Sequence, residues 1–374
     1  MLKLPYRHFF IGLLSCLLPL LALPPVFASQ TVNRLLDPNQ TVDPNLLPTA
    51  PLVYFPETGH HLSNRSRFLD FWRTHGQNVI FGYPLTEEIV ENGRVVQYFE
   101  RARLEHHPEA VGTAWEVQSG LLGQELTNLQ SLVGVGGPQN QVLEVKTPEI
   151  LFGKFGAFWH KWGGITTFGN PLSAEFEQDG RTVQYFERAK FVFYPEDKSW
   201  FYRNLEQQNG LMLNTLYEVR LSDLGRQVAL ARNLNTAPVA KIAAVPDWSP
   251  GLWKRRLEVN LEAQRLTAYE DDLAVYHALV ATGREGFETP KGTYAIYLKT
   301  EMQDMRGSMQ GEEWNVPNVP WVMFVLGGVA LHGTYWHNQF GTGFRLSHGC
   351  INLRMDDAQW LYQWAAVGTT VKIY

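Results

Sequence analysis

The segment Ser347-His348-Gly349-Cys350-Ile351-Asn352, near the C-terminus, places a cysteine between a glycine and an apolar residue. A second histidine lies upstream, in Leu331-His332-Gly333-Thr334. The chain has two cysteines, and Cys350 is the only one that remains if the first 28 residues are removed. Because the thiolate is the reactive form of cysteine and a neighbouring imidazole can generate it, we predict that Cys350 is a nucleophile.

Two histidines are candidates for the general base. His332 is separated from Ser347 by 14 residues rich in glycine and polar side chains, and such a segment can fold back so that His332 meets Cys350. An unperturbed thiol has a pKa of about 8.5, so an imidazole within hydrogen-bond reach is needed to increase the thiolate fraction. His348 would share a strand face with Cys350 but is poorly placed to lie behind it. We predict His332 as the base, and His348 as a second base, a substrate contact or a structural residue.

The residues around Cys350 allow two further interpretations. Gly349 leaves room for a substrate carbonyl, and the amides of residues 348–350 are candidate donors of an oxyanion hole. A single cysteine is, however, most often buried and unreactive. Alternatively, His332, His337 and His348 with Cys350 supply four zinc-compatible ligands, although their spacing matches neither CxxC nor HExxH.

The last part of the chain, residues 251–374, is predicted to be a β-rich domain. Alternating apolar residues predict strands at 257–261, 265–269, 273–280 and 293–297, separated by turn signals such as Glu270-Asp271-Asp272. Only residues 355–366 have helical spacing. Short strands at this density favour an antiparallel sandwich or barrel.

Residues 68–103 and 155–190 align without a gap at an offset of 87 residues. Both copies contain Phe-x-x-Phe-Trp, Phe-Gly-x-Pro-Leu and Gly-Arg-x-Val-Gln-Tyr-Phe-Glu-Arg-Ala. The length of the period indicates two small domains in tandem, each with a short helix, a turn and a strand. The shared aromatic residues are expected to form the domain cores or, alternatively, a face that binds a wall polymer.

The N-terminal segment has the layout of a signal peptide. Lys3 and Arg7 precede an apolar run, and Val26-Phe27-Ala28 offers a cleavage site. The run is shorter than the roughly 20 residues that span a bilayer, which makes an uncleaved anchor the less favoured alternative. We predict an exported protein with these parts: signal peptide 1–28, Pro/Asn/Thr-rich spacer 29–51, repeat domain 52–130, linker 131–147, repeat domain 148–232, linker 233–250 and the domain 251–374.

The composition of the chain excludes one class of function, nucleic-acid binding. The 374 residues are 45% hydrophobic, which allows several cores, and they carry a formal net charge of -5. A nucleic-acid surface would need clustered excess Lys and Arg, so none is predicted.

Residues 254–374 resemble the catalytic domain of the bacterial L,D-transpeptidases, the YkuD family. The family motif is a histidine, a gap of 14 to 17 residues, and then Ser/Thr-His-Gly-Cys-x-Asn, and this sequence contains it without a departure. Thr282-Gly283 and the segments 289–294 and 316–321 also match in order. The two repeats are similar to the LGFP-type repeats of secreted bacterial wall proteins, with Phe81 and Phe168 in place of leucine.

The resemblance implies a mainly β protein, in which a β-sandwich catalytic domain with a short helix follows two small α+β repeat domains. It implies that Cys350 attacks the carbonyl of the third residue, a diamino acid, in a peptidoglycan tetrapeptide stem and releases terminal D-Ala. A side-chain amine of a neighbouring stem then accepts the acyl group. The resemblance implies no metal or organic cofactor, and it makes carbapenem-type β-lactams candidate covalent inhibitors. The candidate oxyanion and substrate residues are Gly349, Ser347, Gly333, Asn352, Trp321 and Arg354.

Three alternatives remain open at this stage. The acyl-enzyme can pass its acyl group to water, as an L,D-carboxypeptidase, or to a protein amine, as an enzyme that anchors proteins to the wall. In a third alternative the protein is chiefly a wall-binding module, since the repeats occupy more of the chain than the catalytic domain. We expect the repeats to hold the enzyme on the wall or to present it at a fixed distance from the membrane, and to contribute nothing to the chemical step.

Overall fold

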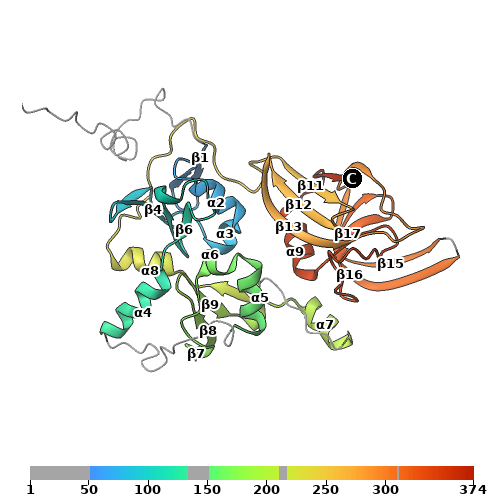
Figure 1. Cartoon of the computed structure of the whole chain (residues 1–374), viewed down its shortest axis with the longest axis horizontal. Helices are drawn as coiled ribbons and strands as arrows, with labels where there is room; N and C mark the ends of the chain where they lie inside the picture. The colour runs from blue at the N-terminus through green and yellow to red at the C-terminus, as the bar shows by residue number, and fades with distance from the viewer. Residues whose placement is uncertain (1–50, 134–150, 210–216, 310) are drawn as a thin grey trace, which may run out of the picture. The chain divides into compact units, whose positions relative to one another are not determined.

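The computed structural model describes residues 51–133, 151–209, 217–309 and 311–374 (Figure 1). The predicted signal peptide, the spacer up to residue 50 and most of the first linker lie outside these residues. Among the helices of the described part, none is both long enough and apolar enough to cross a membrane.

The first repeat consists of a hairpin, two short helices, a four-stranded sheet and a closing helix. Strands β3 to β6 are antiparallel and are neighbours in chain order. The elements are β1 (Leu52–Phe55), β2 (His60–Ser63), α2 (Phe68–Thr74), α3 (Gln77–Ile80), β3 (Ile89–Glu91), β4 (Arg94–Tyr98), β5 (Arg103–His106), the 3-10 helix η2 (Pro108–Ala110), β6 (Val117–Ser119) and α4 (Leu122–Val133).

From its first helix onward the second repeat has the same plan, with an additional helix, α7, inserted before its last strand. Its sheet has the order β10-β9-β8-β7, and the register repeats: Ile89 pairs with Val96, and Phe176 pairs with Val183. The elements are α5 (Gly153–Lys161), α6 (Gly164–Phe168), β7 (Phe176–Gln178), β8 (Arg181–Tyr185), β9 (Lys190–Phe193), η4 (Pro195–Asp197), α7 (Trp200–Asn209), β10 (Val219–Leu221) and α8 (Leu224–Ala231).

The aromatic residues that the repeats share lie in their cores. Helices α2 and α5 each bury both phenylalanines of the Phe-x-x-Phe-Trp pattern. The tryptophan that follows donates a hydrogen bond to the glycine carbonyl of Phe-Gly-x-Pro, from Trp72 to Gly82 and from Trp159 to Gly169, both at 2.9 Å. The core interpretation of these rings is confirmed, whereas binding of a wall polymer by the repeats stays a prediction.

The two repeats exchange their closing helices. Helix α4 of the first repeat lies on the second, where the Gln124 amide donates to the Glu187 carbonyl at 3.0 Å. Helix α8 of the second repeat lies on the first, where the Arg226 amide donates to the Glu100 carbonyl at 3.0 Å. In each helix the preceding residue is a glycine, and a Cβ there would lie 1.9 Å from a carbonyl oxygen of the other repeat. Only glycine allows this approach.

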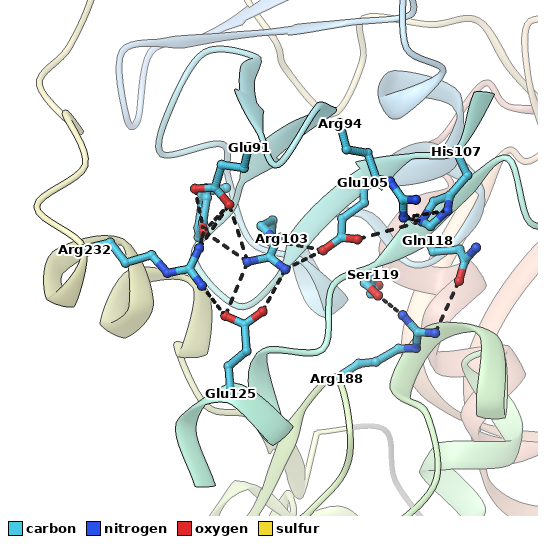
Figure 2. A network of polar contacts seen from close by, with 11 residues as sticks. Glu91, Arg94, Arg103, Glu105, His107, Gln118, Ser119, Glu125, Arg188 and Arg232 are labelled. Carbon is cyan, nitrogen blue, oxygen red and sulfur yellow. Dashed lines mark hydrogen bonds and ion pairs between the residues drawn. The ribbon is translucent and has the colours of Figure 1, made fainter. Parts of the chain in front are cut away.

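A buried arginine joins the exchanged helices to the sheet of the first repeat (Figure 2). Arg103 is 9% exposed and pairs with Glu105 at 2.5 Å, with Glu125 of α4 at 2.9 Å and with Glu91 of β3 at 3.6 Å. Arg232, the residue after α8, pairs with the last two of these carboxylates at 2.7 Å and 3.1 Å. The network therefore links β3, β5, α4 and the end of α8.

Replacing Arg103 with methionine is expected to destabilise the repeat pair by about 2–4 kcal/mol, because three partly buried carboxylates lose their shared partner and two of them keep only the more exposed Arg232. Differential scanning calorimetry of the full chain measures this as a lower melting temperature. Arg94→Met is the matched control, since it removes an exposed pair with Glu109, and its expected cost is about 0.5 kcal/mol or less. Equal melting temperatures for the two variants would show that the network contributes nothing.

The proline-rich stretch that we predict as the second linker, residues 233–250, packs against the β1–β2 hairpin. The Val239 amide donates to the Gly59 carbonyl at 2.9 Å, and the Trp248 amide donates to the Tyr54 carbonyl at 2.7 Å. The Trp248 ring also stacks on Phe55, with ring centroids 5.6 Å apart. These bonds give partners to backbone groups of a stretch that forms no regular strand.

The C-terminal part forms a nine-stranded sheet with one helix, which confirms the mainly β prediction. The strand order is β14-β19-β11-β12-β13-β18-β17-β16-β15, and β13 joins the two halves because it pairs with both β12 and β18. The elements are β11 (Arg255–Asn260), β12 (Arg265–Glu270), β13 (Leu273–Ala281), β14 (Gly292–Ala295), β15 (Leu298–Met309), β16 (Glu312–Leu326), β17 (Val329–Gly333), β18 (Ile351–Leu353), α9 (Met355–Trp364) and β19 (Thr370–Ile373).

The strand pattern favours an antiparallel sheet, but two strand pairs in this sheet are parallel. β11 pairs with β19, and β17 with β18, in parallel. Parallel neighbours need a crossover of about a dozen residues or more. The glycine-rich segment 334–350 supplies the crossover from β17 to β18, so the segment expected to fold back does so between two adjacent strands.

Candidate active site

The parallel pairing of β17 and β18 puts the predicted base and nucleophile on one side of the sheet. His332 pairs with Asn352, and Leu331 pairs with Ile351. Side chains alternate along a strand. Leu331 and Ile351 lie in the main core, so His332 and Asn352 face the other side. Cys350, two residues before Asn352, lies on that side as well.

Cys350 packs against a small apolar cluster formed by Val319, Val322 and Ala330. Its Sγ lies 3.6 Å from the carbonyl oxygen of Gly328, and the Ala330 amide donates a hydrogen bond to it. Burial raises the pKa of the Cys350 thiol to about 11, against a smaller lowering by the Ala330 amide. In the free protein at neutral pH, Cys350 is therefore a thiol and needs a base to become a nucleophile.

The His332 ring is 2% exposed. Burial lowers its pKa to about 4, against a smaller raising by the Gly333 carbonyl, which lies 3.1 Å from Nδ1. Because a carbonyl oxygen only accepts hydrogen bonds, the ring proton belongs on Nδ1, which leaves the lone pair on Nε2. His332 is thus a neutral base at pH 7. The ring of Trp336 stacks on it at 5.8 Å.

A hydroxyl closes the turn that carries the nucleophile. Ser347 Oγ donates to the Cys350 carbonyl at 2.6 Å and accepts from the Gly349 amide at 3.2 Å. The φ angle of Gly349 is 106°, in the region that favours glycine. Of the three amides considered for an oxyanion hole, that of Gly349 therefore already has an acceptor. Asn352 Nδ2 lies 3.0 Å from Nε2 of His337.

His348 lies in a cluster of aromatic and charged side chains. Its ring stacks on Trp314, with centroids 4.2 Å apart and planes 18° apart, and meets Phe287 edge-on at 4.9 Å. Its Nε2 lies 3.0 Å from Nη2 of Arg284 and 3.1 Å from Oε1 of Glu312. These contacts are compatible with a substrate-binding or structural role for His348.

Trp321 is 9% exposed and forms a hydrogen bond with a residue of the second repeat. Its Nε1 donates to the hydroxyl of Tyr202 in α7 at 2.7 Å, and that hydroxyl donates to Oε1 of Gln359 in α9 at 2.9 Å. Tyr202 is fully buried. The inserted helix of the second repeat thus packs on the strand that carries Trp321.

The last two predicted residues, Gly333 and Arg354, occupy different surroundings. A Cβ at Gly333 would lie 2.9 Å from the ring of Pro320, so glycine at this position lets β16 approach β17 closely. Arg354 precedes α9, and its guanidinium lies 5.3 Å from the centroid of the Phe340 ring.

Of the residues considered as zinc ligands, His348 contacts Glu312 and His337 contacts Asn352. Within the described ranges, no three His, Cys, Asp or Glu side chains are arranged to hold a metal ion. Sequence reasoning missed Arg284, Phe287, Glu312 and Trp314 around His348, because strand pairing brings them there and no local pattern marks them.

Comparisons with known proteins agree on the C-terminal domain. Residues 254–373 match the family model described as YkuD, L,D-transpeptidase catalytic domain. The chain is 46% identical over 137 residues to "Probable L,D-transpeptidase YbiS" of Escherichia coli K12, which is 37% of this chain and 31% of that protein. It is 50% identical over 167 residues to "Probable L,D-transpeptidase ErfK/SrfK" of Salmonella typhimurium LT2, which is 40% of this chain and 52% of that protein.

Solved structures are also similar to part of this chain. One is the NMR structure of the catalytic domain of the E. faecium L,D-transpeptidase acylated by ertapenem, at 26% identity, with 33% of this chain and 98% of that chain covered and a TM-score of 0.30. Another is an L,D-transpeptidase from Mycobacterium smegmatis, at 19% identity, 50% and 90% coverage and a TM-score of 0.31. These TM-scores are too low to support the assignment by themselves.

The chain spans between about a third and a half of the two curated relatives, so the match describes a domain and not those whole proteins. Residues 254–373 match the L,D-transpeptidase catalytic domain of the YkuD family.

Proposed function

We propose that the protein is a cysteine-dependent L,D-transpeptidase that joins third-position diamino acids of two peptidoglycan stems. The observation that carries this proposal is the common side of β17 and β18, where a neutral His332 and the Cys350 thiol both lie, inside a domain that matches the L,D-transpeptidase model.

In the first half-reaction Cys350 Sγ attacks the amide carbonyl between the third residue and terminal D-Ala. Its proton passes to Nε2 of His332, which returns it to the leaving nitrogen as the C–N bond breaks. The products are a Cys350 thioester and free D-Ala. In the second half-reaction the side-chain amine of another stem attacks the thioester, a new amide forms, and the thiol is regenerated.

Other acceptors would give other products from the same thioester. Water would make the protein an L,D-carboxypeptidase, and a protein amine would make it an enzyme that anchors proteins to the wall. Because stem peptides lie outside the cytoplasmic membrane, the proposal requires export of the chain, and the repeats are proposed to hold it on the wall.

Incubation of the purified full chain with isolated sacculi, followed by mass spectrometry of the muropeptides, tests the proposal. Dimers joined through two third residues are the expected product. Tripeptides without dimers would indicate carboxypeptidase activity. Sedimentation with the sacculi and unchanged muropeptides would leave only the wall-binding function.

Covalent inhibition by carbapenem-type β-lactams is also proposed, since their strained amide is attacked by the same nucleophile. The expected product is a protein whose mass has increased by one molecule of β-lactam at Cys350.

A further inference from the structure

The long hairpin of β15 and β16 contacts the nucleophile turn through a carboxylate and an indole ring, those of Glu312 and Trp314. Glu312, the first residue of β16, pairs with Nη2 of Arg284 and lies 3.1 Å from Nε2 of His348. The Arg284 amide donates to the Ser347 carbonyl at 3.0 Å, so this arginine is fixed to the turn that ends at Cys350. Two basic side chains beside the nucleophile therefore converge on one carboxylate that the protein itself supplies.

The two contacts of Nε2 of His348 cannot both be hydrogen bonds at the same time. Nε2 of His348 lies 3.0 Å from Nη2 of Arg284 as well as 3.1 Å from Glu312. An arginine only donates, so Nε2 must be unprotonated to accept from it, whereas it must be protonated to donate to Glu312. The side chains of Arg284 and Glu312 are 35% and 45% exposed, and an ion pair this accessible holds the hairpin weakly.

The walls around the pair are aromatic. Trp314 stacks on the His348 ring, Phe287 meets the same ring edge-on, and the Arg284 guanidinium lies 4.3 Å from the centroid of Phe287. Trp314 lies across Gly307 of β15, where a Cβ would lie 2.1 Å from the indole. A guanidinium beside an apolar wall is well suited to a planar carboxylate, which it can bind with two parallel hydrogen bonds.

We propose that Arg284, with His348, binds the terminal carboxylate of the donor stem, and that Glu312 occupies this place until the donor arrives. The inference rests on the proposed function, in which the terminal residue is the leaving group. Its carboxylate is one residue beyond the attacked carbonyl. His348 is two residues from Cys350, in the turn that Ser347 closes, and it contacts Arg284, so both basic side chains belong to the surroundings of the nucleophile.

The test compares two donors, a tetrapeptide stem that ends in a D-Ala carboxylate and the same peptide with a terminal carboxamide. For each donor, KM and kcat are measured for release of the terminal residue. Arg284→Met is expected to raise KM for the carboxylate donor about tenfold or more and to change KM for the amide donor little. Glu312→Gln is expected to lower KM for the carboxylate donor severalfold, because it removes the competing carboxylate.

The opposite changes in KM for the carboxylate donor distinguish a substrate-binding site from an ion pair that only stabilises the hairpin. If both variants raise KM for both donors alike, or if Arg284→Met keeps the preference for the carboxylate donor, the proposal is overturned. Arg306→Met is the control, since it removes the exposed pair with Asp304 on the same hairpin.

A second measurement separates this proposal from the proposed function. Calorimetry measures binding of the carboxylate and amide peptides to Cys350→Ala protein, with and without Arg284→Met. If the parent enzyme releases nothing, the proposed reaction fails, but a preference for the carboxylate peptide that Arg284→Met abolishes still supports the site. Equal binding of the two peptides contradicts it.

Discussion

Replacing Cys350 with alanine is expected to lower acyl transfer by at least about a hundredfold, because removal of a covalent nucleophile normally costs several orders of magnitude. The measurement is release of D-Ala from a tetrapeptide donor, together with the mass of the protein after exposure to a carbapenem. The variant should gain no mass, since Cys350 is the sole cysteine after residue 28.

The fold of the Cys350→Ala variant should survive. The side chain packs only against a small cluster with Val319, Val322 and Ala330, so alanine leaves a small gap, and calorimetry should give a melting temperature close to that of the parent. Turnover above about a hundredth of the parent rate, in a folded variant, would refute covalent catalysis by Cys350.

Replacing His332 with alanine is expected to slow acylation by a carbapenem about 10²- to 10⁴-fold, the usual contribution of a general base. The pH profile gives a sharper result. With a pKa of about 4, His332 is protonated only in strong acid, so the parent rate should be nearly constant from about pH 5 to 8. Without the base, the rate should rise with pH throughout this range, because it then follows ionisation of a thiol whose pKa is about 11.

His348→Ala is the matched comparison for this prediction. It should keep the flat profile, since His348 contacts Glu312 and Arg284 and the base remains in place. If His348→Ala loses more activity than His332→Ala, or if its profile acquires the slope, the roles of the two histidines are reversed. A parent profile that falls near pH 6.5 would contradict the buried, neutral imidazole.

The sequence was sufficient to predict the surroundings of residues whose neighbours lie close along the chain. The turn at Cys350 depends on Ser347 and Gly349, and the repeat cores depend on aromatic residues at helical spacing, so both could be predicted. The parallel pairing of β17 with β18 could not, because strand alternation is the same in parallel and antiparallel pairs. That pairing decides which residue stands opposite His332.

Contacts between segments far apart in the sequence could not be predicted either. Glu312 meets His348 only because β15 and β16 are long, and Tyr202 meets Trp321 only because α7 is inserted in the second repeat. The same insertion hid the exchanged helices. Leu122-Gly123 and Leu224-Gly225 correspond in structure but lie 102 residues apart, so an alignment at 87 ends before them.

The helix exchange has a consequence for how this chain can change over time. Deleting either repeat as one block would remove the helix that covers its sister: α8 shares a buried cluster with Leu85, Val96 and Tyr98 of the first repeat. The remaining first repeat would keep the sequence of its sheet, but its cluster would be exposed to water. Loss of one repeat would therefore impair folding of the other, and would do more than remove one of two equivalent domains.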